Sequence, residues 1–373
     1  MTPEEAAVPE VSMWAGGYTA DAGGSGVGIT ALAVDPITGD LAVVGTAVET
    51  PSPSFLLAHG DMVYAVGEAA DRVEAFRRGP GGSLQWAGGQ PSGGSGPCHL
   101  HVVGDLLLTS HYGDGTVAVH PLAADGSIGE ATQLLTAEGS GPRPQQDGPH
   151  AHATLHIGGG IVLSADLGTD TVHVHALRGG RLDRIGAVAL PAGTGPRHMA
   201  LLSSGRVLLV GELDGTLHAL EGAGGSWRVA ASTACAAVPD ARDSAAEVQV
   251  SADERLAYVG LRGSDRIAVV GIADDGALAP VAAFDCGGET PRHHAIVDDR
   301  LHVANQGSGT VASFRLDPAT GLPTAAPAVI AVPSPTYLLP LAWPAAPATL
   351  SAAAGERPPG SPPPPRGRAS RRR

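Results

Sequence analysis

A short proline-containing phrase recurs along this chain, and its recurrence limits the folds that the chain can adopt. The clear copies are Gly96-Pro97-Cys98-His99, Gly148-Pro149-His150-Ala151-His152, Gly195-Pro196-Arg197-His198 and Thr290-Pro291-Arg292-His293-His294. Each copy precedes a short apolar segment, a turn of small residues and a second segment that ends in a polar residue. This pattern predicts two β-strands joined by a tight turn. Because the same loop is built several times, we expect a repeat architecture.

The spacing of the prolines gives the size of the repeating unit. The units open at Pro53, Pro97, Pro149, Pro196, Pro291 and Pro335, which are 44, 52, 47, 95 and 44 residues apart. The interval of 95 holds two units, so one unit lacks its proline; it lies around Ala246-Glu247-Val248-Gln249-Val250. A period of roughly 45 residues with several β-segments is typical of four-stranded propeller blades.

The two ends of the chain complete the ring. A seventh unit opens at Pro333–Leu338, which resembles Pro51–Leu56, but it has room for only one strand before a Pro-rich tail. The missing strands are expected at Val11–Tyr18, Gly28–Val34 and Leu41–Gly45. We therefore predict an all-β, seven-bladed β-propeller, closed by N-terminal strands that pair with a C-terminal strand. Closure of this kind removes the open sheet edges that β-proteins otherwise have to protect.

Composition agrees with one propeller domain at residues 11–343. The 373 residues include 53 Gly and 31 Pro, which suits many short strands and tight turns. The acidic segment 1–10 and the Pro- and Arg-rich segment 344–373 are predicted to be disordered.

Charge and cysteine content restrict the partners and the compartment. The formal net charge of −14 argues against nucleic acid as a partner. No apolar run approaches the ~18 residues of a membrane span, and residues 1–10 lack the pattern of a signal peptide. Three scattered cysteines, Cys98, Cys235 and Cys286, indicate free thiols in a reducing compartment. We expect a cytoplasmic monomer that needs no cofactor, and the spacing of His150, His152 and Asp166 does not require a zinc ion.

The polar residues of the repeat should meet at one face of the ring. Successive strands of a blade run antiparallel, so the connector into strand one and the loop after strand two lie on the same face. The connectors carry His99, His150, His152, Arg197, His198, Arg292, His293 and His294. The loops carry Glu68, His111, Asp166, Glu212, Arg262, Asn305 and Gln306. Arg and His side chains can bind an anion there, and a carboxylate can orient a base.

Each group also has a structural interpretation. The histidines His99, His101, His152, His198 and His294 would equally suit hydrogen bonds between neighbouring blades. The arginines Arg197, Arg262 and Arg292 occupy mouth positions where other units have neutral residues. Because a buried guanidinium is costly without an anionic partner, we favour a functional role for these three.

These phrases resemble a known family, the seven-bladed propeller lactonases typified by the bacterial 6-phosphogluconolactonases and similar to fungal carboxy-muconate cyclases. The resemblance extends from Gly17 to about Leu316, and its most specific stretches are Gly148–His152, Ala165–Asp170 and Gly193–His198. Further support comes from Gly211–Asp214, Glu247 with Leu261–Gly263, and Thr290–His293 with Ala304–Gln306. It implies hydrolysis of a sugar lactone, with 6-phosphogluconolactone as the leading substrate. The functional set of the cyclase branch corresponds by motif to His150, Arg197, Glu212 and Arg262.

The expected mechanism is attack of an activated water on a small anionic lactone. His150 or Glu212 would act as general base, and Arg197 would stabilise the oxyanion. Arg262 and Arg292 would hold the anionic group of the substrate, while His152 and Asp166 orient the base. The remaining substrate-binding candidates are Glu68, His198, Asn305 and Gln306. Two alternatives remain: a carboxy-muconate-type cycloisomerase, and a non-catalytic binding propeller, which the polar mouth and the 3% aromatic content disfavour.

Overall fold

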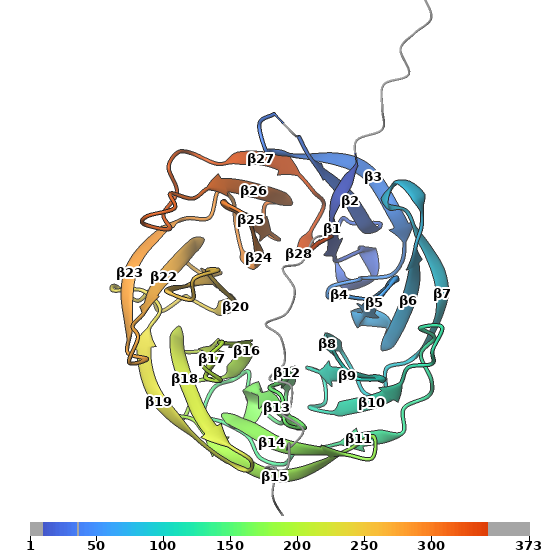
Figure 1. The fold of residues 1–373 in the computed structure, drawn as a ribbon, viewed down its shortest axis with the longest axis vertical. Helices are drawn as coiled ribbons and strands as arrows, with labels where there is room; N and C mark the ends of the chain where they lie inside the picture. Colours follow the sequence, from blue (N-terminus) through green and yellow to red (C-terminus); the bar gives the residue numbers. More distant parts are fainter. Residues whose placement is uncertain (1–9, 36, 342–373) are drawn as a thin grey trace, which may run out of the picture.

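Seven four-stranded antiparallel sheets form a closed ring in the computed structural model, which describes residues 10–35 and 37–341 (Figure 1). The predicted seven-bladed, all-β propeller is confirmed. The only helical elements of the described residues are short 3-10 turns: η1 (Ala20–Ala22), η2 (Glu68–Ala70), η3 (Pro80–Gly82) and η4 (Leu167–Thr169). Within the same ranges no helix has the length and apolarity to cross a membrane. Apart from Glu10, the ends expected to be disordered, 1–10 and 344–373, lie outside the described residues.

Six blades are built from consecutive strands, named below in order from the channel outward. The first three are β4 (Leu56–His59), β5 (Met62–Gly67), β6 (Arg72–Arg78) and β7 (Leu84–Pro91); β8 (Pro97–Val103), β9 (Leu106–His111), β10 (Val117–Pro121) and β11 (Gln133–Leu135); and β12 (Ala151–His156), β13 (Ile161–Asp166), β14 (Thr171–Arg178) and β15 (Arg181–Ala189). The next three are β16 (Pro196–Leu201), β17 (Val207–Gly211), β18 (Thr216–Ala223) and β19 (Ser226–Ala234); β20 (Ala245–Val250), β21 (Leu256–Leu261), β22 (Arg266–Ile272) and β23 (Leu278–Asp285); and β24 (Pro291–Val297), β25 (Arg300–Asn305), β26 (Thr310–Arg315) and β27 (Ala328–Ala331).

The seventh blade joins the two ends of the chain, as predicted. Its inner strand is β28 (Pro335–Pro340), followed outward by β1 (Val11–Gly17), β2 (Gly28–Val34) and β3 (Leu41–Glu49). Trp14 of β1 pairs with Leu339 on one side and with Ala31 on the other. Figure 1 shows the red β28 beside the blue β1. The ring is therefore held shut by main-chain hydrogen bonds between residues more than three hundred positions apart.

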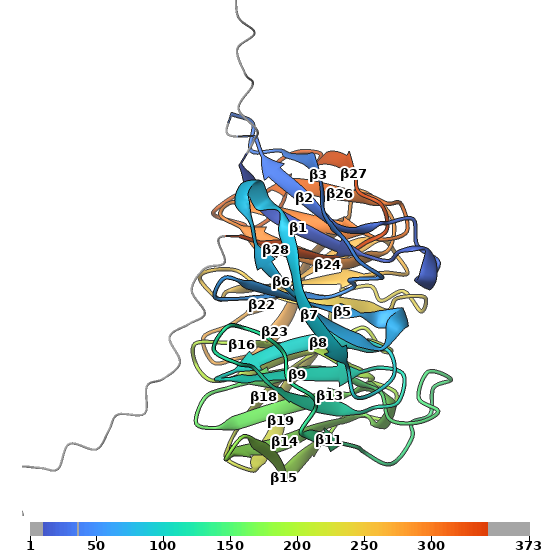
Figure 2. The same cartoon turned by 90° about the vertical axis from the view of Figure 1, so that its right-hand side faces the viewer.

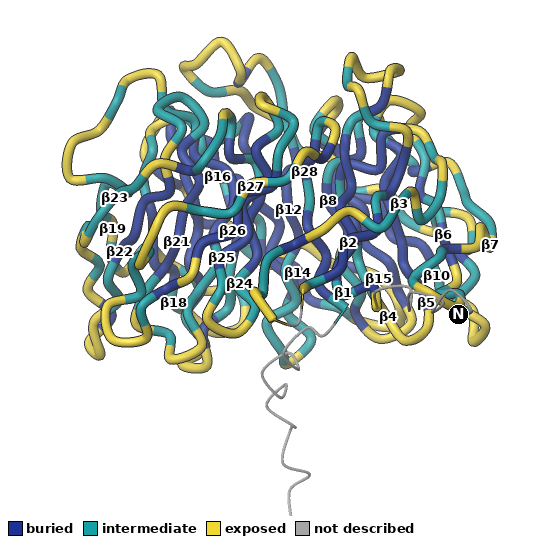
Figure 3. Tube along the Cα trace, turned by 90° about the horizontal axis from the view of Figure 1, so that it is seen from above, coloured by how far each residue is buried: buried dark blue, intermediate teal, exposed yellow. Residues whose placement is uncertain are grey.

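The hydrophobic core lies between neighbouring blades. Leu208 and Val210 of β17, for example, pack in one buried cluster with Ala257 and Val259 of β21. Middle strands such as β17 and β21 are buried on both faces against the two adjacent blades, and they are apolar along almost their whole length. Figure 3 shows the buried residues as a layer between exposed loops at the two faces of the ring. This rigid layer fixes the positions of the loops.

A β-bulge near the start of the inner strand repeats around the ring. The register shifts between Pro97 and His99 in β8 and between Pro291 and His293 in β24, and β12, β16, β20 and β28 show the same irregularity. A bulge leaves one residue unpaired and re-aims its side chain. Ala151 pairs with Asp166 in β12 as Pro97 pairs with His111 in β8. Ala151 is thus the equivalent of the blade-opening prolines, and the expected alignment of Pro149 with them was wrong by two residues.

A backbone hydrogen bond at one face of the ring recurs in every blade. The residue before the inner strand accepts from the N–H of the residue just after the second strand. The donor and acceptor pairs are Tyr18–Ser334, Glu68–Ser52, Tyr112–Gly96, Leu167–His150, Glu212–Gly195, Arg262–Ser244 and Gln306–Thr290. The prediction that connectors and second-strand loops share a face is therefore confirmed. Figure 2 shows the ring edge-on, with its inner strands running across the thickness.

Candidate active site

The bulge and the repeated hydrogen bond arrange side chains in three layers around the channel. The residues just after the second strands form the rim ring: Tyr18, Glu68, Tyr112, Leu167, Glu212, Arg262 and Gln306. The bulge positions, together with Ser54 at the corresponding place before β4, form the upper ring: Ser54, Cys98, His152, Arg197, Ala246, Arg292 and Thr336. The residues that follow them form the lower ring: Phe55, His99, Ala153, His198, Glu247, His293 and Tyr337.

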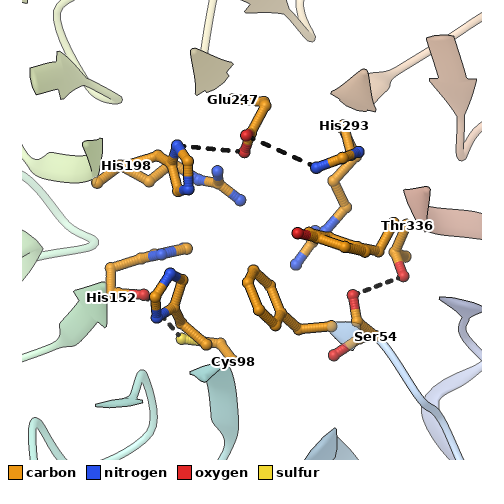
Figure 4. Close-up of a pocket in the computed structure, with 12 residues that line it drawn as sticks. Ser54, Cys98, His152, His198, Glu247, His293 and Thr336 are labelled. Atoms are coloured by element: carbon orange, nitrogen blue, oxygen red, sulfur yellow. Dashed lines mark hydrogen bonds and ion pairs between the residues drawn. The ribbon is translucent and has the colours of Figure 1, made fainter. Parts of the chain in front are cut away.

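The upper and lower rings enclose a small cavity on the channel axis (Figure 4). All of their members except the two alanines line it. Its volume is about 30 Å³, which is room for one or two waters rather than for a sugar. A larger ligand can therefore sit only above the cavity, at the level of the rim ring, with a reacting atom pointing inward. His152, His198 and His293 each present one buried ring nitrogen without a hydrogen-bond partner among the described residues.

One carboxylate at the mouth is shared by two arginines. Arg197 Nε lies 2.8 Å from Glu212 Oε2, and Arg262 Nη2 lies 2.9 Å from Glu212 Oε1. Burial raises the pKa of Glu212, but Arg262 and Arg197 outweigh it and hold the pKa below its usual value. Burial, followed by the nearby Arg262, lowers the pKa of Arg197 to about 10, so it stays charged at neutral pH. The three groups together carry one net positive charge.

Arg292 has no carboxylate within ion-pair distance in the part of the chain that the structure describes. Its guanidinium lies 5.1 Å from the centre of the Tyr18 ring, and Nη1 donates a 3.4 Å hydrogen bond to Gln306 Oε1. Tyr18 in turn donates to Glu68 Oε1 at 3.0 Å, and Ser54 donates to the other oxygen. Glu68 is therefore occupied by hydroxyl groups, which leaves Arg292 available to an anion from outside.

His150 lies at the edge of the mouth rather than in the cavity. Its ring stacks on Tyr112 with centroids 4.6 Å apart, and Nδ1 contacts the main-chain oxygen of Tyr112. A ring nitrogen that meets a carbonyl oxygen has to donate, so Nδ1 carries the proton. In the neutral ring Nε2 carries the lone pair, and once this nitrogen is protonated it can donate to Asp147 Oδ1, which lies 3.0 Å away. This nitrogen can accept a proton, and Asp147 would stabilise the resulting cation.

His152 and Asp166 have different surroundings. His152 belongs to the upper ring, and burial, followed by Arg197, lowers its pKa well below the usual value. Asp166 accepts hydrogen bonds from the main-chain N–H of His150 at 2.8 Å and of Gly168 at 3.1 Å. The carboxylate thus fixes the backbone of His150, not its ring.

Several of the predicted mouth residues hold the scaffold together, and of these His99 also lines the cavity. His111 Nδ1 lies 2.8 Å from Thr116 O, and Asn305 donates to Cys286 O at 3.0 Å. The structural interpretation is confirmed for three histidines that join neighbouring blades. His99 Nδ1 accepts from Thr154 N–H at 3.4 Å, His101 Nε2 from His156 N–H at 3.0 Å, and His294 Nε2 lies 3.0 Å from Tyr258 O.

Glu247 was not among the sequence-predicted site residues, yet its carboxyl group lines the cavity. Its oxygens lie 3.4 Å from His198 Nδ1 and 3.6 Å from His293 Nε2, and Gln249 Nε2 donates to Oε1 at 2.7 Å. Burial raises its pKa to about 8. A Glu in the inner strand Ala245–Val250 was the available signal, but only the bulge register shows that Glu247 corresponds to His198 and His293.

Aromatic residues are few in this chain, yet several gather here. Tyr18 and Tyr112 belong to the rim ring, and in the lower ring Phe55 packs at a tilt against Tyr337 with ring centroids 4.3 Å apart. Burial raises the pKa of Tyr18 to about 12, so its hydroxyl remains a donor. The floor of the cavity is thus partly apolar, while the mouth is cationic. Among the described residues no three His, Cys, Asp or Glu side chains are grouped to hold a metal ion.

Comparison with known proteins agrees with this geometry. The family model described as "Lactonase, 7-bladed beta-propeller" matches residues 12–340. A 6-phosphogluconolactonase of Bacillus subtilis is 28% identical over 264 residues, which are 68% of this chain and 76% of that protein. The structure of a putative 6-phosphogluconolactonase from Bacteroides fragilis has a TM-score of 0.80 at 28% identity, covering 90% of this chain and 99% of the other. A periplasmic gluconolactonase of Pseudomonas aeruginosa has a TM-score of 0.82 at 26% identity, with the same coverage.

Proposed function

Since the chain belongs to the seven-bladed β-propeller lactonase family and is a lactone-hydrolysing enzyme, we propose that its substrate is an anionic sugar lactone. The specific substrate that we propose is 6-phosphogluconolactone. The reaction takes place at the mouth of the propeller, above the small cavity. The product is the open-chain sugar acid. A cytoplasmic, monomeric enzyme of sugar-phosphate oxidation is part of the same proposal.

The observation that carries the proposal is the position of Arg292. A guanidinium that is partly withdrawn from water and has no carboxylate partner within residues 10–35 and 37–341 is a ready site for an anion. The Arg197–Glu212–Arg262 cluster adds a second positive charge beside it. The protein as a whole carries a net charge of −14, so the mouth attracts an anion against the general field of the molecule.

The proposal gives each end of a bound lactone its own set of residues. Arg292, assisted by Arg262, holds the phosphate or carboxylate group. Arg197 donates to the carbonyl oxygen, which becomes an oxyanion when water adds to the carbonyl carbon. His152, which lines the cavity in the same ring as Arg197 and is kept neutral by burial, can accept a hydrogen bond from the attacking water or from a sugar hydroxyl.

The general base of this proposal is His150. Its Nε2 lone pair takes a proton from the water, and Asp147 stabilises the imidazolium that forms. Glu212, the other candidate, is held ionised by two guanidinium groups, which weakens it as a base. Its better role is to position Arg197 and Arg262. Asp166 supports the base indirectly by fixing the backbone of His150.

The decisive experiment measures ring opening of freshly prepared 6-phosphogluconolactone with and without the purified protein. We expect the enzymatic rate to exceed the spontaneous rate, and kcat/KM to be at least tenfold lower for glucono-δ-lactone, which lacks the phosphate, because a charge-assisted contact contributes about 1.5 kcal/mol or more. Equal kcat/KM values for the two lactones would show that the enzyme does not recognise the phosphate group. No acceleration of either lactone would refute the proposal as a whole.

A further inference from the structure

Glu247 is a buried acid that the reaction proposed so far does not use, because that reaction relies on His150 and the arginines of the mouth. The residue is 3% exposed, and its carboxyl group lines the floor of the cavity. No Lys or Arg of the described residues lies within ion-pair distance of the Glu247 carboxyl group. The nearby Arg197 is paired with Glu212 instead. A carboxyl group withdrawn from water without a cation is more stable in its neutral form. Glu247 therefore carries a proton.

The contacts of the carboxyl group show which oxygen holds that proton. Oε1 accepts a hydrogen bond from Gln249. It also faces His293 Nε2, which is the protonated nitrogen, since His293 Nδ1 accepts from the N–H of Leu338 at 3.2 Å. The hydrogen bond from Gln249, together with the His293 N–H 3.6 Å away, favours Oε1 as the carbonyl oxygen of the acid. The proton therefore lies on Oε2, the oxygen that faces His198 Nδ1 (Figure 4).

We propose that Glu247 is the general acid of lactone hydrolysis and protonates the ring oxygen as it leaves. The inference rests on the proposed function, because it needs a lactone at the mouth. The proton passes directly or through one water, for which the 30 Å³ cavity has room. His150 then lies at the edge of the mouth and Glu247 on the floor, so base and acid approach the substrate from different sides. His198 is a positioning residue for Oε2.

The proposed step is balanced. His150 takes a proton from water, and the water oxygen forms a bond to the carbonyl carbon while the carbonyl π electrons move to the oxygen held by Arg197. When that oxyanion collapses, the bond between the carbonyl carbon and the ring oxygen breaks, and the electron pair stays on the ring oxygen. The ring oxygen takes the proton from Glu247 Oε2. Exchange with solvent then removes the proton from His150 and returns one to Glu247.

The titration of Glu247 agrees with this role. Burial raises its pKa to about 8, against the smaller opposing effect of Arg197. An acid with a pKa slightly above neutrality is protonated at the working pH and still gives up its proton readily. The titratable or charged groups around it are Arg197, His198, His293 and Tyr337. The two imidazoles cannot replace it as acids, because burial lowers the pKa of His198 to about 3 and that of His293 well below its usual value.

The test compares Glu247→Gln with the wild type and with the control Glu130→Gln, which removes an exposed carboxylate that has no ion-pair partner in the described part of the chain. On the sugar lactone we expect kcat to fall by ~10²–10⁴ in Glu247→Gln and to be unchanged in Glu130→Gln. A thiolactone of the same sugar acid expels a stabler anion that needs less protonation, so its hydrolysis should fall far less. The wild-type kcat/KM should decline above a pH of about 8, and this decline should be absent in Glu247→Gln.

Infrared difference spectroscopy gives a readout that does not depend on turnover. We expect the C=O stretching band of a protonated carboxylic acid in the wild type at pH 7, its loss as the pH rises through about 8, and its absence in Glu247→Gln. A missing band at pH 7 would overturn the inference even if the variant did not fold. Equal losses on lactone and thiolactone, or an activity that rises through pH 8, would also overturn it while leaving the lactonase proposal intact. A wild type that opens no lactone would refute both.

Discussion

Arg197 and Glu212 meet across two loops of one blade, with Nε and Oε2 only 2.8 Å apart. Arg197 is the bulge residue of β16, and Glu212 directly follows β17. The hydrogen bond from Glu212 N–H to Gly195 O holds the two loops together. The side chain that would stabilise an oxyanion is therefore fixed before any substrate arrives, which is the condition for efficient electrostatic stabilisation.

Substitution of Arg197 should therefore reduce turnover more than binding. In Arg197→Lys the ammonium group keeps the charge but loses the planar fork that contacts Glu212 and the carbonyl oxygen together. We expect kcat to fall by ~10²–10³ with a small change in KM, as measured by steady-state kinetics on the lactone. Arg178→Lys, at an exposed position of β14, is the matched control and should match the wild type. A rise in KM at constant kcat would instead place Arg197 in ground-state binding.

Substitution of Arg292 should have the opposite signature. Arg292→Gln removes the guanidinium that lies over Tyr18 and has no carboxylate partner among the described residues. Loss of a charge-assisted contact of about 1.5–3 kcal/mol corresponds to a KM for the phosphorylated lactone that is roughly 10–100 times higher. The KM for glucono-δ-lactone should change little, because that substrate carries no anion. Kinetics on both lactones test this, and an equal effect on the two would show that Arg292 does not recognise the phosphate.

The repeat made most of the scaffold predictable. The proline spacing predicted seven blades, and the room left at each end of the chain predicted that β28 would join β1–β3. Antiparallel pairing then required connectors and loops to share one face, as the seven repeated hydrogen bonds confirm. These features follow from the period of the sequence, which is visible without coordinates.

The register of the inner strands was not predictable in the same way. A β-bulge adds one residue to a strand without changing the composition or the approximate period. For this reason Pro149 was aligned with the other prolines, although Ala151 occupies their place. Without the register, the direction of the Glu247 side chain could not be predicted either, because it depends on the bulge in β20. Side-chain direction at the channel therefore had to come from the structure.

Glu247 should also make the stability of the protein depend on pH. Its pKa is raised from 4.5 to about 8 in the folded protein. A raised pKa means that the folded state binds the proton more tightly than the unfolded state, so its contribution is complete below pH 4.5 and is lost as the pH rises through about 8. Urea unfolding of the wild type and of Glu247→Gln between pH 5 and 9 tests this. The free energy of unfolding of the wild type should decline more steeply, and parallel curves would contradict a buried neutral carboxyl.

A final comparison separates the scaffold histidines from the proposed base. His294 is fully buried, and its Nε2 joins Tyr258 O of the neighbouring blade. His294→Ala leaves that buried oxygen without its partner, which should lower the free energy of unfolding by about 1–3 kcal/mol. In His294→Gln, the amide can partly replace Nε2 and should restore part of the loss.

His150 contacts the main-chain oxygen of Tyr112 at the edge of the mouth, and its Nε2 faces the exposed Asp147. A Gln at position 150 can keep the contact to Tyr112 but cannot accept a proton from water. His150→Gln should therefore unfold like the wild type in urea and lose ~10²–10⁴ in kcat. The two histidine variants thus have reciprocal effects on stability and turnover. If His150→Gln kept its activity while Glu212→Gln lost it, the general base would be Glu212 despite the two arginines that hold it ionised.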